Sequence, residues 1–194
     1  MPQTSLTTEQ IAKASDYLAE TRDALVESAT RLSASQWAFK PRPDCWSINQ
    51  IVEHLVLIEN AIQGIIGKMG EAPEALPGFE SAQMDDLIMA TVPKRSGKAK
   101  SPPHLLPADR WNGPQALEQF VKSREQTLQL LSAASVLALP LRGRVRPHPI
   151  FGPWDGYHWI LAMAAHCARH TAQIHELKAE PDFLHTSSAA ATLQ

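Results

Sequence analysis

The chain has few features that would indicate a disulfide-linked or membrane-spanning protein. Its two cysteines, Cys45 and Cys167, cannot build a disulfide framework, and no CxxC pair suggests a cysteine metal site. No apolar run is long enough to span a bilayer, and the polar N-terminus lacks the apolar core of a signal peptide. We therefore expect a soluble cytoplasmic protein with free thiols.

Neither sign of charge dominates, and the commonest catalytic motifs are missing. A formal net charge of −2 over 194 residues, with a pI near 6.4, gives no reason to expect a nucleic-acid or membrane partner. The basic run at residues 94–100 is interpreted as a solvated loop. The motifs GxSxG, GxGxxG and HExxH and the P-loop are absent, which argues against the common hydrolase, dinucleotide-binding and NTPase classes.

Apolar residues recur at helical spacing in four segments, so we expect an all-α protein with one domain over residues 1–194. Ser47 and Asn112 are expected to cap the second and third helices. The core runs from about residue 7 to residue 180, and residues 186–194 are expected to be a flexible tail. Helices are expected over about 7–32, from 47 to 67 or 70, from 112 onward, and from 154 to 178 or 180.

The segment at residues 71–111 is rich in Pro, Gly and charge, and a connection of this length is unusual in a compact domain. It is better explained as a crossover along a bundle, which lets the second and third helices run parallel. A short helix is expected near residues 81–90. Residues 137–153 are expected to be irregular. The sequence thus predicts a four-helix bundle with a long crossover loop between helices two and three.

The segment AHCARHTAQI at residues 165–174 is the most informative about function. It places His166 and His170 four residues apart, on one face of the fourth helix, so both imidazoles can point at the same place. Two neighbouring buried imidazoles would repel each other if both were protonated, so both should be neutral, which is the form that binds metal. The alternative is a pair of core histidines that make helix–helix hydrogen bonds.

A third ligand from a facing helix would complete a three-histidine metal site with open positions. His54, at the edge of the apolar stripe of the second helix, is the candidate; its alternative is a helix-interface histidine near the surface. Three imidazoles suit zinc, nickel or iron(II). Gln50 and Gln173 each lie within one turn of a predicted ligand and are candidates to hydrogen-bond to a ligand or to bound water, or else are ordinary interfacial amides.

The remaining polar residues on these helices receive no catalytic role. Cys167 points about 100° away from His166 around the helix and is expected to be a packing residue. His148 precedes the fourth helix in a loop that could fold over the site. His158 and His175 lie too far along the helix for the same ion and are expected to be surface groups or supports for the ligands. The carboxylates of Glu53, Glu59 and Glu176 could act as acid or base, but charged residues on bundle helices are usually solvated, so solvated carboxylates are expected.

Three segments together resemble the DinB-like family of metal-binding four-helix bundles. PRPDCWSINQIVEHL at residues 41–55 is similar to the W-S and E-H-L pattern at the start of the family's second helix. HPIFGPW at residues 148–154 is similar to the H-P-x-F-G-P approach to its last helix, and HCARHTAQI at residues 166–174 to its H-x-x-x-H-x-x-Q-I ligand motif. The resemblance runs from about residue 7 to residue 177, and the loop at 71–111 matches least.

The resemblance implies an up-down-down-up bundle, a homodimer, and one divalent ion held by His54, His166 and His170. Characterised relatives include S-transferases and isomerases that use low-molecular-weight thiols such as bacillithiol or mycothiol, with the metal activating the thiol as thiolate. Metal-dependent thiol transfer, or a related conjugation or isomerisation of a small-molecule substrate, is the leading hypothesis. Candidate receptors for the carboxylates of an acidic thiol are Arg142, Arg144 and Arg146, with a solvated basic loop as the alternative.

Two other functions stay open at this point. Metal-bound hydroxide would make the protein a hydrolase. A structural or absent metal would make it a non-catalytic stress-related or interaction protein, which the lack of an obvious acid or base favours.

Overall fold

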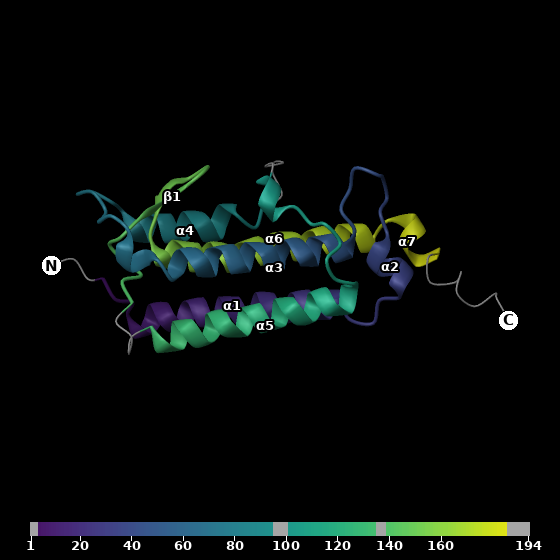
Figure 1. The fold of residues 1–194 in the computed structure, drawn as a ribbon, viewed down its shortest axis with the longest axis horizontal. Helices are drawn as coiled ribbons and strands as arrows, with labels where there is room; N and C mark the ends of the chain where they lie inside the picture. The colour runs from purple at the N-terminus through teal and green to yellow at the C-terminus, as the bar shows by residue number, and fades with distance from the viewer. Residues whose placement is uncertain (1–3, 95–100, 135–138, 186–194) are drawn as a thin grey trace.

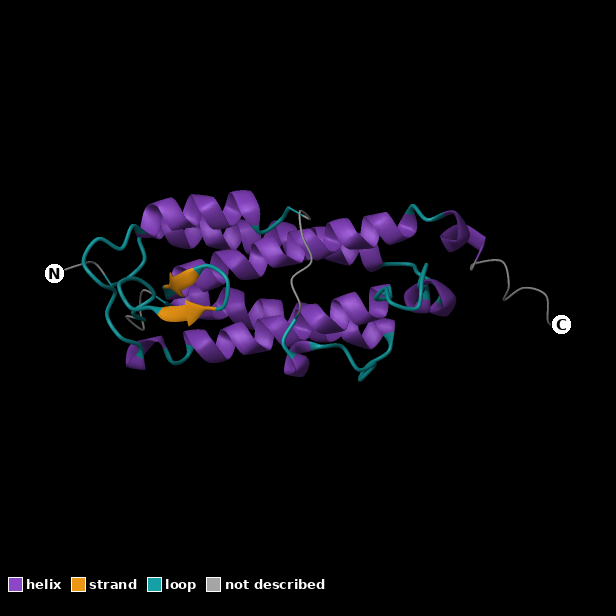
Figure 2. Ribbon diagram, turned by 90° about the horizontal axis from the view of Figure 1, so that it is seen from above, coloured by secondary structure: helices purple, strands orange, loops and turns teal. Residues whose placement is uncertain are grey.

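The computed structural model describes residues 4–94, 101–134 and 139–185, and four long helices dominate it (Figures 1 and 2). In Figure 1, α1 and α5 form one layer, and α3, α6 and α4 form the other. None of the described helices is both long and apolar enough to cross a membrane. The all-α class is confirmed. The long helices are α1 (Thr8–Ala29), α3 (Ile48–Ile66), α5 (Gly113–Ala133) and α6 (Gly156–Lys178).

Shorter elements occupy the connections. The helix expected near residues 81–90 is α4. One end of the bundle carries a two-stranded antiparallel hairpin, which is orange in Figure 2. The short elements are α2 (Ala34–Ala38), η1 (Met69–Glu71), α4 (Ser81–Thr91), η2 (Pro103–Leu105), β1 (Arg146–His148), β2 (Gly152–Trp154) and α7 (Pro181–His185).

Each long helix begins at a side-chain cap. The side chains of Thr7, Ser47, Asn112 and Asp155 each accept the backbone N–H of the residue three positions on, and the side chain of that residue accepts the backbone N–H of the cap. The predicted starts of the helices are confirmed. The first helix ends three residues before residue 32 because Thr30 is extended and Arg31 has a φ of 61°.

Two connections between the long helices contain short regular elements. Residues 33–44 include α2, capped by Ser33, and its Trp37 is 5% exposed. The described part of the other segment, residues 139–153, contains most of the hairpin, in which His148 pairs with Gly152. Elements of three to five residues are too short for a periodic apolar pattern, which explains why the sequence did not reveal them. The predicted tail at 186–194 lies outside the described residues.

The helices α3 and α5 run in the same direction. Near their starts, Asn49 Nδ2 donates to the Trp111 carbonyl at 3.0 Å, and near their other ends Gln63 Nε2 donates to Thr127 Oγ1 at 2.9 Å. The chain between them, including α4, therefore returns to the end of the bundle from which α3 started, as a crossover requires.

A buried ion pair lies inside the bundle, so the prediction of a solvated Glu59 was wrong. Glu59 is 1% exposed and Arg124 is fully buried; Arg124 Nε donates to Glu59 Oε1 at 2.8 Å. Arg124 Nη1 also donates to the Leu18 carbonyl at 2.7 Å. Burial raises the pKa of Glu59, although the charge and hydrogen bonds of Arg124 oppose this. The sequence held a signal: Phe120, Arg124, Thr127 and Leu131 step by four, three and four along the buried face of α5.

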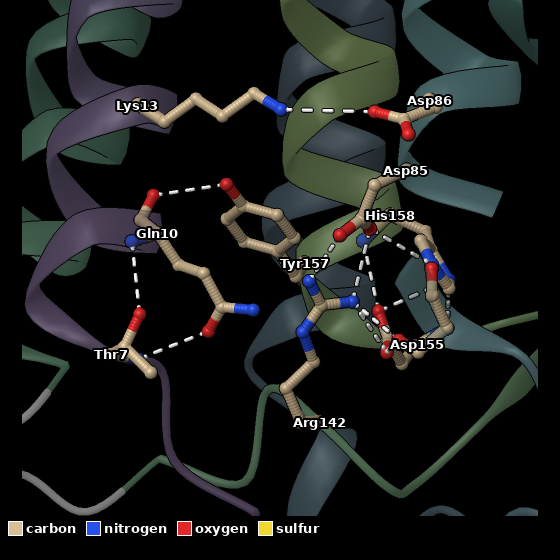
Figure 3. A network of polar contacts seen from close by, with 10 residues as sticks. Thr7, Gln10, Lys13, Asp85, Asp86, Arg142, Asp155, Tyr157 and His158 are labelled. Atoms are coloured by element: carbon tan, nitrogen blue, oxygen red, sulfur yellow. Dashed lines mark hydrogen bonds and ion pairs between the residues drawn. The ribbon is translucent and has the colours of Figure 1, made fainter. Parts of the chain in front are cut away.

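A second buried network joins α4 to the start of α6 (Figure 3). Arg142 Nη2 donates to Asp85 Oδ2 at 2.5 Å, and Arg142 Nη1 donates to Asp155 Oδ2 at 3.0 Å. His158 is fully buried; its Nδ1 accepts the Asp155 N–H, which leaves Nε2 to donate to the Ser81 carbonyl at 2.9 Å. Both alternatives given for Arg142 were therefore wrong, since it is neither solvated nor free to bind the carboxylate of an acidic thiol. His158 supports α4 rather than a predicted ligand.

Acidification is expected to weaken this network. Burial disfavours ionised Asp85, but hydrogen bonds and charges from His158 and Arg142 outweigh burial and lower the pKa of Asp85. A lowered folded-state pKa gives stability that is complete above the unfolded value of about 3.9 and is lost as the pH falls through the folded value. The free energy of unfolding of wild type, measured in urea, should therefore fall more steeply below about pH 4 than that of Asp85→Asn. Parallel pH profiles for the two proteins would contradict this assignment.

Candidate metal centre

His54 from α3 and His166 and His170 from α6 meet at the contact between the two helices. A ring nitrogen from each lies within 4.8 Å of the other two. The Nε2 atoms of His54 and His166 are 3.3 Å apart, and the rings of His166 and His170 have centroids 4.5 Å apart. The fold thus brings together the three histidines that the sequence singled out.

Hydrogen bonds to the outer nitrogens orient two of these rings. His54 Nδ1 lies 2.8 Å from the Leu105 carbonyl, which can only accept, so Nδ1 carries the proton. His170 Nδ1 lies 2.9 Å from Gln173 Oε1, and the same tautomer follows. With Nδ1 protonated, Nε2 of His54 and of His170 carries a lone pair, and that of His54 faces His166 Nε2. This is the arrangement in which a carbonyl or amide behind a histidine prepares its other nitrogen for a metal.

Burial keeps all three imidazoles neutral. It lowers the pKa of His54, and it lowers the pKa of His166 to about 3, with repulsion from a protonated His54 contributing. Burial also holds the pKa of His170 well below its ordinary value, with His166 and His54 adding to the effect. Neutral nitrogens at pH 7 are able to donate lone pairs, so the residues present fit a divalent ion that prefers imidazole.

Residues outside α3 and α6 also contact the histidines. The indole of Trp46 lies over the site, with its ring centroid 4.8 Å from that of His54 and 6.2 Å from that of His170. Residues 103–111, which we call the strap, carry the Leu105 carbonyl that binds His54. The strap includes η2 and forms the last part of the crossover before α5.

The two candidate glutamines have different positions. Gln173 contacts a predicted ligand directly through its bond with His170. Gln50 instead donates from Nε2 to Asp109 Oδ2 at 3.2 Å and completes the cap of α3 with Ser47. Gln50 therefore holds the strap, and the structure gives it no hydrogen bond to His54 within the described ranges.

The carboxylate next to His54 is buried, so the prediction of a solvated Glu53 was also wrong. Its oxygens accept the backbone N–H groups of Ala108 at 3.0 Å and Arg110 at 3.2 Å, and Arg110 Nη1 at 2.5 Å. These partners lie 55 to 57 residues further along the chain, so no local sequence pattern predicts them.

Other candidate residues are engaged elsewhere. The ring of His148 stacks on Trp154 at 3.9 Å, and its Nδ1 accepts the N–H groups of Ile150 and Phe151, so it organises the hairpin. Burial lowers the pKa of His148 to about 4. His175 is exposed.

Cys167 faces α1, where its thiol donates to the Thr21 carbonyl at 3.3 Å. Burial raises the pKa of this thiol to about 11, which makes it a packing residue rather than a nucleophile. Arg144 and Arg146 donate to the carbonyls of Ala72 and Lys68, at 2.6 Å and 2.8 Å. Neither arginine therefore lies ready to receive a carboxylate at the histidine cluster.

Comparison with known proteins agrees with this picture. The family described as the DinB superfamily matches residues 17–174, a range that includes all three histidines. The chain is 30% identical over 140 residues to the uncharacterized protein YuaE of Bacillus subtilis (strain 168), an alignment that covers 72% of this chain and 81% of the relative. No solved structure matches the chain significantly.

Proposed function

Because this chain belongs to the DinB superfamily, a family of metal-binding proteins, we propose that His54, His166 and His170 hold one divalent ion in a metal-dependent enzyme. The observation that carries the proposal is the convergence of three neutral ring nitrogens within 4.8 Å. Hydrogen bonds to Nδ1 fix the tautomers of His54 and His170. Zinc, nickel and iron(II) all suit three imidazoles. The up-down-down-up order is part of the proposal, and the shared direction of α3 and α5 supports it.

Three neutral ligands leave the charge of a divalent ion undiminished and positions open, so a bound ion would lower the pKa of a thiol or water. We favour thiol chemistry, that is, S-transfer or a related conjugation or isomerisation of a small molecule that uses a low-molecular-weight thiol. The chain's own residues supply orientation and shielding. The Leu105 carbonyl and Gln173 fix the tautomers, and Trp46 covers the rings of His54 and His170.

A turnover assay tests the enzymatic part of the proposal. Tag-free protein reconstituted with zinc, nickel or iron(II) is offered an electrophile together with bacillithiol, mycothiol or simple thiols. Thiol consumption should require both metal and thiol and should fall to background in His170→Ala, since this variant lacks a ligand. Metal-dependent turnover without thiol would favour the hydrolase. A bound metal without turnover across the panel would favour the non-catalytic protein.

The other expectations stay predictions. They are a homodimer, a small-molecule substrate, no nucleic-acid or membrane partner, a cytoplasmic location and a single domain over residues 1–194. Size-exclusion chromatography with light scattering would measure the oligomeric state directly.

A further inference from the structure

We propose that Glu53 is a positioning residue for the metal ligand His54 and acts through the strap. The inference rests on the proposed metal site. Glu53 and His54 are consecutive on α3, and both bind the strap, at points three to five residues apart. Glu53 accepts from Ala108 and Arg110, whereas His54 bonds to the Leu105 carbonyl.

Glu53 is the buried anchor of the strap. Its side chain is 0% exposed, and its two oxygens collect two backbone N–H groups and one guanidinium. A carboxylate only accepts hydrogen bonds, and taking it out of water is costly unless donors surround it. Charge-assisted bonds of this kind are stronger than bonds between neutral groups, so they fix the donors as well as the acceptor.

The strap has little else to hold it in place. None of residues 103–110 is buried, and Leu106 is 41% exposed, so apolar packing contributes little to its position. The remaining bonds to α3 come from Asn49 and Gln50, which donate to the exposed Asp109 carboxylate at 3.4 Å and 3.2 Å, and from Asn49 to the Trp111 carbonyl at 3.0 Å, where the strap joins α5. Exposed polar contacts are worth less than buried ones. The buried carboxylate therefore decides where the strap lies.

The position of the strap in turn sets the state of His54. The Leu105 carbonyl, 2.8 Å from Nδ1, is the group that selects the tautomer with a free Nε2. Arg110 Nη1 also donates to the Leu106 carbonyl at 3.4 Å, which ties the Glu53 anchor to the residue that follows Leu105. Loss of the anchor releases the carbonyl, and the His54 ring is then free to change its tautomer or rotate.

The test uses Glu53→Gln and a matched control. In metal-free protein, nitrogen-15 NMR reports which ring nitrogen of His54 carries the proton, independently of any activity. We expect wild type to show the Nδ1–H form and Glu53→Gln a mixture of tautomers. Loss of the partner behind a metal-binding histidine typically costs about 10- to 100-fold in metal affinity, so the zinc Kd of Glu53→Gln should rise by about that factor.

Glu59→Gln is the control, since it alters another buried carboxylate on α3 that pairs with Arg124 and not with the strap. It should lower the unfolding midpoint but keep the Nδ1–H form of His54 and the wild-type zinc Kd. If Glu53→Gln does not fold, Arg110→Ala removes one of the three donors from an exposed position and should shift the tautomer and the Kd in the same direction.

Two results would overturn the inference. One is a Glu53→Gln protein with the wild-type tautomer and zinc Kd. The other is a Glu59→Gln protein that shifts both quantities equally, because general loosening of α3 would then explain the effect. Failure of wild type to bind zinc, nickel or iron(II) would instead remove the proposed function, while the tautomer measurement would still decide whether Glu53 positions His54.

Discussion

Replacing His166 with alanine is expected to abolish stoichiometric metal binding. Its ring forms a triangle with the other two: Nε2 lies 3.3 Å from His54 Nε2, and the ring centroid lies 4.5 Å from that of His170. Because losing a residue behind a ligand already costs about 10- to 100-fold in affinity, losing the ligand itself should cost more than about 100-fold. Elemental analysis of tag-free protein after dialysis against each metal measures the ratio of metal to chain.

His175→Ala is the matched control for this prediction. His175 is exposed on the same helix, nine residues beyond His166, so its removal takes away an imidazole without touching the cluster. It should load metal like wild type. Equal loading of His166→Ala and His175→Ala would show that the cluster does not bind the metal.

Replacing Arg124 with methionine is expected to destabilise the protein by about 3–5 kcal/mol, because Glu59 would be left buried without its cation. At roughly 2–4 °C per kcal/mol for a chain of this size, the melting temperature should fall by about 6–20 °C. Thermal unfolding followed by circular dichroism at pH 7 measures the change.

The double variant with Glu59→Met and Arg124→Met separates the pair from its surroundings. Two apolar side chains of similar volume need no partner charge, so the double variant should recover most of the lost stability. If Arg124→Met alone melts like wild type, the buried pair does not stabilise the fold. If the double variant melts as low as Arg124→Met, the lost hydrogen bonds of Arg124 to α1, rather than the stranded charge, account for the destabilisation.

The starts of the helices and the metal-ligand candidates were accessible from the sequence because both depend on short spacings. A cap such as Ser47 or Asn112 bonds to a residue three positions away. His166 and His170 share a face because they are four residues apart. The step from two histidines to three needed only a second inward-facing helix, and the stripe around His54 supplied it.

The burial of Glu53 and Glu59 could not be predicted from such short spacings. Their helix spacing gives the direction of each side chain but not the group it meets. Glu53 meets a strap 55 to 57 residues away, and Glu59 meets Arg124 at a separation of 65. A carboxylate is usually solvated, and here donors from a distant segment offset the desolvation cost of burying it.

The sequence by itself therefore determined the helical class, the helix starts and the set of three histidines, since each follows from local hydrogen bonding or from the helical period. Only the tertiary structure decided which charges are buried, that Arg142 belongs to Asp85 and Asp155, and that the strap lies behind His54. The physical reason is that a buried polar group is stable only with its partner, and that partner is chosen by how the helices pack.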